Sequence, residues 1–329
     1  MKAHRTIVAL AISGALSFGL AACGDDEDES AGASGGSTEE ASGGDLKGTI
    51  SVDGSSTVYP FAQTAAELFN EAYPDVRITV GQSGTGGGFE KFCAGETDIS
   101  TASRPIKDDE EVPLCEKNSV KYGEAQIAND GIAVVTNKSL KVDCLTTAEL
   151  KKLWNKGSKV KSLADVRSDL PDTALSLYGP GTDSGTFDFF TDEINGEEGA
   201  TREDYEPSED DNQLVTGVEG DEGGLGYFGF SYYEAAADQL NLVGVDSGDG
   251  CVKPSKETIQ DGSYTPLARP IFMYPSSKSL ARPEVKAFMD FIVENQQAIA
   301  DAAKIVPMTS EQAAKSAESV KAAEAAAGA

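Results

Sequence analysis

Short apolar segments of strand type alternate with segments of helical periodicity through most of the chain. In the first helical segment, Tyr59–Ala72, Pro60 stands near the start, where its missing N–H group costs nothing. The apolar residues of this segment form one stripe that fits against a sheet. An alternation of this kind predicts an α/β fold. The first five elements are expected at Thr49–Val52, Tyr59–Ala72, Arg77–Val80, Gly88–Ala94 and Asp98–Ala102.

The same pattern continues to about residue 308. The capping box Thr146-Thr147-Ala148-Glu149 predicts the start of a short helix, and a long periodic segment predicts a helix from Pro283 to about Ala303. Further strands are expected at Gly131–Thr136, Ala174–Tyr178, Leu242–Val245 and Ile271–Tyr274. The tail 309–329 is rich in Ala, Glu and Lys without a strong apolar stripe, so we expect a marginal or frayed helix there.

Residues 1–22 have the pattern of a signal peptide, because Lys2 and Arg5 precede an uncharged apolar run that is short for a membrane span. The run ends in Leu20-Ala21-Ala22-Cys23, which resembles the bacterial lipobox, so we expect Cys23 to be the lipidated first residue of the mature chain. The alternative is an ordinary signal peptide followed by a chance cysteine. Residues 23–46 then comprise this cysteine and an acidic Gly/Ser linker, expected to be a flexible tether.

Composition excludes several classes of function. Basic residues number 27 against 55 acidic ones, and the resulting formal charge of −28 has the wrong sign for nucleic-acid binding. The one histidine, His4, lies in the predicted signal peptide. The mature chain therefore has no imidazole for a catalytic triad, a histidine metal site or acid–base chemistry.

The cysteines that follow Cys23 indicate disulfides. Four remain in an exported chain, at positions 93, 115, 144 and 251, and they allow three connectivities. Proximity in sequence favours Cys93–Cys115 and Cys144–Cys251. A zinc site is the competing interpretation, but no pair has Cys-x-x-Cys spacing, so we expect neither a metal nor a cofactor.

Three clusters of Gly, Ser and Thr each follow a predicted strand and precede a predicted helix: Asp53–Thr57, Gly81–Gly88 and Gly181–Thr186. Helix starts offer free N–H groups and the positive end of the helix dipole, while glycines permit close approach of the backbone. One such cluster alone is equally well explained as a turn with a helix cap. Three of them favour a shared cradle for an oxyanion, and none has the pattern of a dinucleotide or P-loop motif.

A fourth segment, Ile99–Pro105, places Ser103 and Arg104 just after a predicted strand. An arginine can offer its planar fork to a tetrahedral oxyanion through two hydrogen bonds. The alternative is an ordinary surface arginine in a loop.

These four segments, in this order and spacing, closely resemble motifs of the PstS family, the substrate-binding lipoproteins of the high-affinity ABC phosphate importer. The resemblance covers about residues 47–308 and extends to Gly226-Tyr227-Phe228-Gly229 and Pro266-Leu267-Ala268-Arg269-Pro270. It implies a type II periplasmic-binding-protein fold, with two α/β lobes joined by a two-strand hinge and the ligand in the cleft. The expected lobes are 47–127 plus 267–308 and 128–266.

The resemblance also implies partners and a location. The ligand would be inorganic phosphate, and the closed protein would meet the permease subunits of an ABC transporter. We expect an exported monomer, held by its lipid at the outer face of the cytoplasmic membrane.

The phosphate-binding residues that the motifs imply come from all four segments. They are Ser55, Ser56, Thr57, Ser83, Gly84, Thr85, Ser103, Arg104, Asp183, Ser184, Gly185 and Thr186. Two positions depart from the better-known enteric pattern: Ser103 stands where an aspartate accepts the phosphate proton, and Pro180 stands where an arginine is found. We therefore expect Arg104 to supply the charge, and we leave Asp53 and Asp183 as alternatives for the proton acceptor.

Two other functions remain open from sequence alone. A binding protein for another oxyanion, such as sulfate, would share this fold and anchor. An exported phosphatase would need a metal cluster or an activated nucleophile, which the residues do not suggest, so we expect no enzyme activity.

Overall fold

The computed structural model describes residues 46–182 and 184–327. The predicted signal peptide, Cys23, the linker up to residue 45 and Asp183 lie outside the described residues. Among those described, no helix is both long and apolar enough to cross a membrane.

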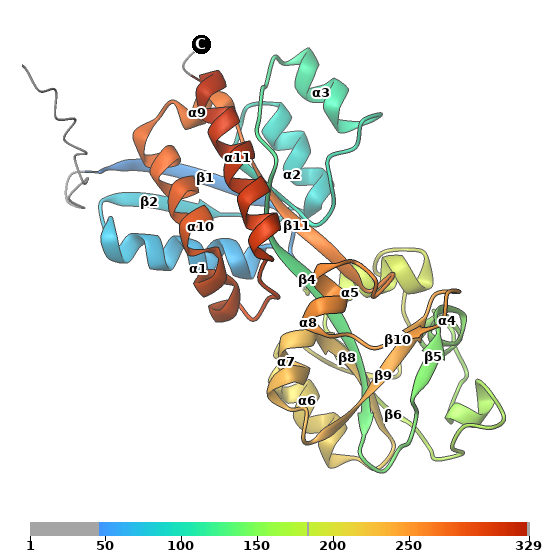
Figure 1. Cartoon of the computed structure of the whole chain (residues 1–329). Coiled ribbons are helices and arrows are strands. Elements are labelled where there is room, and N and C mark those ends of the chain that lie inside the picture. Colours follow the sequence, from blue (N-terminus) through green and yellow to red (C-terminus); the bar gives the residue numbers. More distant parts are fainter. Residues whose placement is uncertain (1–45, 183, 328–329) are drawn as a thin grey trace, which may run out of the picture. The chain divides into compact units, whose positions relative to one another are not determined.

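A first group of strands has the order β2-β1-β3-β11-β4. In it, β1 (Gly48–Gly54) pairs in parallel with β2 (Val76–Val80) and with β3 (Ile99–Ala102), whereas β11 (Ala268–Pro275) runs antiparallel to β3. The helices between these strands are α1 (Tyr59–Ala72), α2 (Gly84–Cys93) and α3 (Glu111–Lys117). The predicted β-α-β-α-β order of this region is confirmed; Figure 1 labels its first four elements, β1, α1, β2 and α2.

The long strand β4 (Ala125–Asn137) joins this group to a second one. Its first half pairs with β11, and its second half pairs with β8 (Gly224–Gly229) and β9 (Leu240–Asp246). Because β4 and β11 pair along residues 125–131 and 268–273, the chain passes between the two groups on adjacent antiparallel strands.

The second group continues from β8 to β6 (Ser176–Pro180) and β7 (Glu206–Ser208), while β5 (Cys144–Thr146) and β10 (Cys251–Val252) pair with β9. Its helices are short: α4 (Thr147–Trp154), α5 (Gly185–Phe190), α6 (Asp211–Gly220), α7 (Phe230–Ala235) and α8 (Lys256–Gln260). A 3-10 turn spans Leu163–Asp165, and a π-helical turn, Thr191–Asn195, continues α5. The predicted capping box at the start of α4 is confirmed, with Thr146 and Glu149 bonding each other's backbone.

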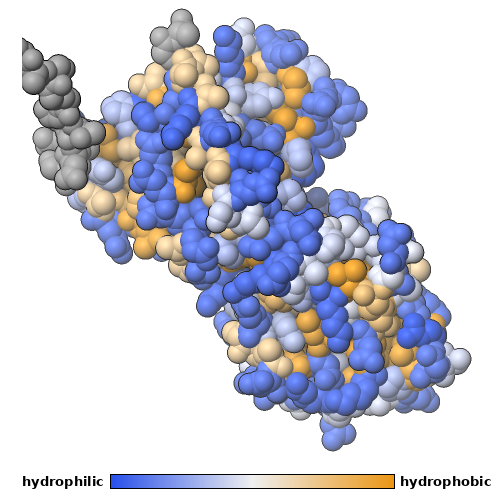
Figure 2. Space-filling model, in the orientation of Figure 1, coloured by the Kyte–Doolittle hydropathy of each residue, from blue (hydrophilic) through white to orange (hydrophobic). Residues whose placement is uncertain are grey.

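Two large cores fill these groups. One contains Phe61, Phe69 and Phe288 and draws its buried residues from 50–128 and 271–323. The other contains Trp154 and Tyr227 and draws them from 132–267, with Val306 in addition. The predicted lobe boundaries stay a prediction, because the described part of the chain forms one compact unit. Figure 2 shows a mainly hydrophilic surface with scattered hydrophobic patches on the visible face.

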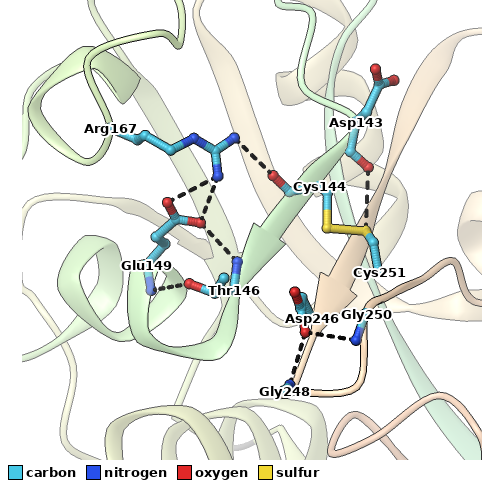
Figure 3. Close-up of a disulfide and its surroundings, with 9 residues drawn as sticks. All are labelled: Asp143, Cys144, Thr146, Glu149, Arg167, Asp246, Gly248, Gly250 and Cys251. Atoms are coloured by element: carbon cyan, nitrogen blue, oxygen red, sulfur yellow. Dashed lines mark hydrogen bonds and ion pairs between the residues drawn. A yellow bond between two sulfur atoms is a disulfide. The ribbon is translucent and has the colours of Figure 1, made fainter.

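The structure contains both disulfides that proximity favoured. Cys93–Cys115 ties α2 to α3. Cys144–Cys251 ties β5 to β10, which lie on either side of β9 (Figure 3). Gly244 of β9 is the register partner of Cys144, and a Cβ atom there would lie 2.5 Å from the sulfur of Cys251, so this glycine leaves room for the bridge.

The tail forms a helix as predicted, but the expectation that this helix is marginal or frayed was wrong. After α9 (Ser277–Leu280) and α10 (Pro283–Ala302), the chain forms an 18-residue helix, α11 (Ser310–Ala327), which packs on α9, α10 and β4. Val320 and Ala323 are buried in the first core, and Lys286 forms a 2.8 Å ion pair with Glu324. The stripe that docks consists of small side chains, which a search for a strong apolar stripe does not detect.

Candidate ligand-binding site

A cavity of about 620 Å³ gathers three of the four predicted segments. Its lining residues come from the ends of β1 and β3, from the start of α2, from α5 with the turn after it, and from the start of β11. Those predicted from sequence are Ser55, Ser56, Thr57, Ser83, Gly84, Thr85, Ser103 and Arg104.

A smaller cavity of about 290 Å³ is lined by the remaining segment, Ser184, Gly185 and Thr186. Ser56 and Thr57 line both cavities, so the two are neighbours. The structure thus brings together every predicted binding residue except Asp183, which is not described. Whether they bind phosphate stays a prediction at this point.

Two glycines allow the loops to meet. A Cβ atom on Gly185 would lie 2.2 Å from the backbone nitrogen of Thr57, and the Thr57 hydroxyl donates a 3.1 Å hydrogen bond to the Gly185 carbonyl. A Cβ atom on Gly54, which has φ of +142°, would lie 2.1 Å from the carbonyl oxygen of Thr101. Both positions therefore require glycine, the first for contact between two segments and the second for the turn after β1.

The second loop is held by side chains. The hydroxyl of Thr85 lies 3.0 Å from that of Ser103 and accepts a 3.2 Å bond from the Ser103 backbone. Asp53 accepts from the backbone and hydroxyl of Ser83 and from Lys91. Burial alone would raise the pKa of Asp53, but the bonds from Lys91 and Ser83 outweigh burial and hold it below the ordinary value. Asp53 lines neither cavity, so its contacts support the loop.

Arg104 lines the larger cavity but is already paired. Its two terminal nitrogens donate to both oxygens of Glu111, at 2.9 and 2.7 Å, and one of them also donates to the carbonyl of Pro105. The hydrogen bonds that Arg104 donates to Glu111 raise the pKa of Arg104 above its ordinary value. The guanidinium group of Arg104, which we expected to bind an oxyanion, thus binds the carboxylate of Glu111.

The site also contains an arginine to which sequence reasoning gave no role. Arg269, on β11, donates a 2.7 Å hydrogen bond to the Thr57 hydroxyl, and its guanidinium carbon lies 3.5 Å from the ring centroid of Phe189. Its Nε atom lies 3.5 Å from an oxygen of Asp130, the residue opposite it on β4. The signal was present in the sequence, because Arg269 belongs to one of the motifs that carry the resemblance.

One side of the larger cavity is acidic. Asp188, Asp192, Glu193 and Glu198 line it, and Asp188 accepts a 3.1 Å hydrogen bond from the Ser56 hydroxyl. Burial raises the pKa of Asp188, Glu193 and Glu198 above their ordinary values. Within 46–182 and 184–327, no group of three or more His, Cys, Asp or Glu residues is placed to hold a metal ion.

Two α/β groups linked by adjacent strands, with Ser, Thr, Gly and Arg residues from separate segments around one cavity, define a binding protein of the type II periplasmic-binding-protein class. A family profile described as a PBP superfamily domain matches residues 38–296, so the chain belongs to this superfamily. The predicted fold class is confirmed.

Its relatives place the chain more narrowly. It is 44% identical to the protein SphX of Synechococcus elongatus over 262 residues, which is 79% of this chain and 77% of that protein. It is 41% identical to the phosphate-binding protein PstS of Staphylococcus epidermidis, over 79% of each chain. The chain belongs to the PstS family, which is one of substrate-binding proteins rather than enzymes.

Solved structures agree with this assignment. The structure of "a possible phosphate binding protein" from Planctomyces limnophilus matches with a TM-score of 0.80 and 40% identity, over 85% of this chain and 99% of that one. An ABC-type phosphate transport receptor from Vibrio cholerae shares the fold, with a TM-score of 0.60 and 20% identity over 79% of this chain and all of that one.

Proposed function

We propose that this chain is an extracytoplasmic binding protein that captures inorganic phosphate and delivers it to an ABC importer. The observation that carries the proposal is the meeting of Ser56, Thr57, Thr85 and Ser103 around one cavity, from segments far apart in the sequence. The names of the PstS relatives and of the Planctomyces limnophilus structure support phosphate as the ligand.

The donors suit a dehydrated oxyanion. Hydroxyl and backbone N–H groups add hydrogen bonds without adding charge, and each is stronger in a dry site than in water. The starts of α1 and α2 add the positive ends of two helix dipoles at Ser55–Thr57 and Ser83–Thr85. Capture on this plan needs binding and release but no bond breaking, so we propose that the chain is not an enzyme.

The lipid anchor, the oligomeric state, the location and the lobe boundaries are proposed from the sequence. We propose that Cys23 carries the lipid, that the mature chain is a monomer at the outer face of the membrane, and that the lobes are 47–127 plus 267–308 and 128–266. Metabolic labelling with radioactive palmitate tests the anchor, with Cys23→Ser as control. Equal labelling of both chains, or of neither, would refute the lipid assignment.

Calorimetric titration of residues 24–329, freed of bound ligand, tests the ligand. We expect one-to-one binding of phosphate and no response to sulfate at neutral pH. Equal binding of sulfate would instead support a general oxyanion carrier, and steady hydrolysis of p-nitrophenyl phosphate would support a phosphatase.

A matched pair of variants tests the site. Thr85→Val removes a cavity hydroxyl at nearly constant volume, and we expect phosphate affinity to fall about tenfold through loss of one hydrogen bond. Thr216→Val makes the same change on an exposed part of α6 outside both cavities, and we expect no change. Equal affinities for the two variants would contradict the proposed site.

A further inference from the structure

We propose that Arg269 is the residue whose positive charge binds the anion, and that Arg104 is a positioning residue. This inference rests on the proposed function, because it assigns the charge within the same site.

Arg104 has few donors left for a ligand. A guanidinium group has five N–H donors. Three hydrogen bonds from Arg104 go to Glu111 and Pro105, and Glu111, with a side chain only 9% exposed, has both oxygens engaged. Glu111 also accepts from the backbone of Lys107, so the pair fixes the chain that follows β3. An anion that displaced Arg104 would leave a buried carboxylate without its cation, which is costly.

Arg269 is placed differently. Among the described residues, Thr57 is the one that accepts a hydrogen bond from Arg269, whose Nε atom faces Asp130 at 3.5 Å. The remaining N–H groups of its two terminal nitrogens have no hydrogen-bond partner in the described part of the chain. The side chain is 18% exposed and lines the larger cavity. Unpaired terminal N–H groups on the edge of a stacked guanidinium are suited to an oxyanion with several acceptor atoms.

Both strand groups hold this guanidinium in place. Asp130 contacts it from β4, the adjacent strand, at 3.5 Å, while Phe189 of α5 stacks against its face. Thr57, which bonds it from the end of β1, also bonds Gly185 at the start of α5. The charge therefore lies where the predicted binding segments meet. Within the described residues, the interactions of Arg104 are instead with Pro105 and Glu111, which follow β3, and with the ring of Phe89 at 5.9 Å.

The acidic side of the cavity makes this charge necessary. Four carboxylates line the cavity, at Asp188, Asp192, Glu193 and Glu198, against three cations at Arg104, Lys107 and Arg269. With Arg104 neutralised by Glu111, an entering dianion would meet a negative surface. The positive charge of Arg269 interacts with the charges of Asp188 and Glu193, so this residue offsets part of their repulsion of an anion.

Calorimetric titration of full mature chains with phosphate tests the assignment through matched variants. We expect Arg269→Gln to weaken binding about 100-fold and Arg269→Lys about tenfold, because lysine keeps the charge but loses the fork. The double variant Arg104→Gln/Glu111→Gln removes the other ion pair without leaving a lone buried charge, and we expect less than about a fivefold change. The reverse order of effects would overturn the inference.

A chemical-rescue measurement separates charge from packing. Arg269→Ala should regain phosphate binding when millimolar guanidinium replaces sodium at constant ionic strength, which a merely structural role would not produce. Thermal unfolding shows whether each variant is folded. If Arg269→Ala or Arg269→Gln unfolds the chain, the phosphate affinity of Arg269→Lys decides the test. If Arg269→Ala and Arg269→Lys both bind phosphate as tightly as the parent chain, the role of Arg269 is refuted but the proposed function is not. A parent chain that does not bind phosphate refutes the proposed function, and the inference with it.

Discussion

Asp211 offers a quantitative test of the electrostatics beside the candidate site. It lies in the first turn of α6, lines the smaller cavity and accepts a 3.3 Å hydrogen bond from the backbone of Gly229. Burial raises the pKa of Asp211 to about 6, and the charges of Asp210, Asp130 and Glu209 add to this effect. The substitution Asp211→Asn keeps an acceptor oxygen for Gly229 and removes the charge.

The sign and size follow from proton linkage. Below about pH 4 the carboxyl is protonated in both the folded and the unfolded chain, so aspartate and asparagine should differ little. Between pH 4 and 6 the unfolded chain ionises first, and the folded chain loses stability until its own carboxyl has ionised. A shift of about two pKa units corresponds to about 3 kcal/mol. The folded-state pKa already contains every effect of the folded environment on this charge, so we expect a gain of up to about 3 kcal/mol for the variant at pH 8.

Urea unfolding at several pH values, followed by the fluorescence of Trp154, measures this difference. Trp154 is the one tryptophan of the chain and is buried in the second core. The neighbouring Asp210→Asn is the matched control, because hydrogen bonds from Asn212 lower the pKa of Asp210, and its effect should have the opposite sign. A constant difference between Asp211→Asn and the parent from pH 4 to 8, or a loss of stability at pH 8, would refute the reasoning.

Three further predictions concern packing and covalent links. Gly185→Ala should weaken phosphate binding at least about tenfold in calorimetry, because its Cβ atom would press on the backbone of Thr57, whereas Gly220→Ala, with open space around it, should have no effect. Val320→Asp should reduce the free energy of unfolding by about 3 kcal/mol and expose α11 to proteolysis, since Val320 is only 2% exposed; a protected tail would contradict this. Replacing both cysteines of the β5–β10 disulfide with serine should destabilise the chain by up to about 4.7 kcal/mol, whereas the same change at the α2–α3 disulfide should cost about 3 kcal/mol. The difference is expected because the paired cysteines are 107 residues apart in the first disulfide and 22 in the second. The opposite order in urea unfolding would disprove this loop-entropy argument.

Local signals predicted the elements whose cause is local. The helix over Tyr59–Ala72 has the predicted bounds, because its start contains a proline and its apolar stripe is regular. The capping box of α4 also lies at the predicted residues. In contrast, α2 begins at Gly84, four residues before the predicted start, although glycines disfavour helix. A Cβ atom on Gly88 would lie 2.5 Å from Gly54, so this part of α2 depends on close tertiary packing.

The full length of β4 and the role of Arg269 could not be predicted from the sequence, for the same reason. The predicted strand began at Gly131, but β4 begins at Ala125, and the missed part contains the buried polar residues Asn129 and Asp130. Asn129 bonds Gln312 of α11, and Asp130 faces Arg269 on β11. Polar residues of this kind predict a loop when the sequence is considered alone, because their hydrogen-bond and ion-pair partners lie more than a hundred residues away. The same distance hid Arg269, whose function depends on the register between β4 and β11.

The net charge of −28 and an anion ligand are compatible once the site is considered locally. At physiological salt the Debye length is about 8 Å, so carboxylates elsewhere on the surface contribute little at the cavity. The carboxylates that matter are those lining it, and burial raises the pKa of Asp188, Glu193 and Glu198. An entering anion disfavours their ionised forms further, so proton uptake by these groups would relieve part of the repulsion. The acidic lining therefore opposes the anion less than four fully ionised carboxylates would, while Arg269 and the neutral donors provide the attraction.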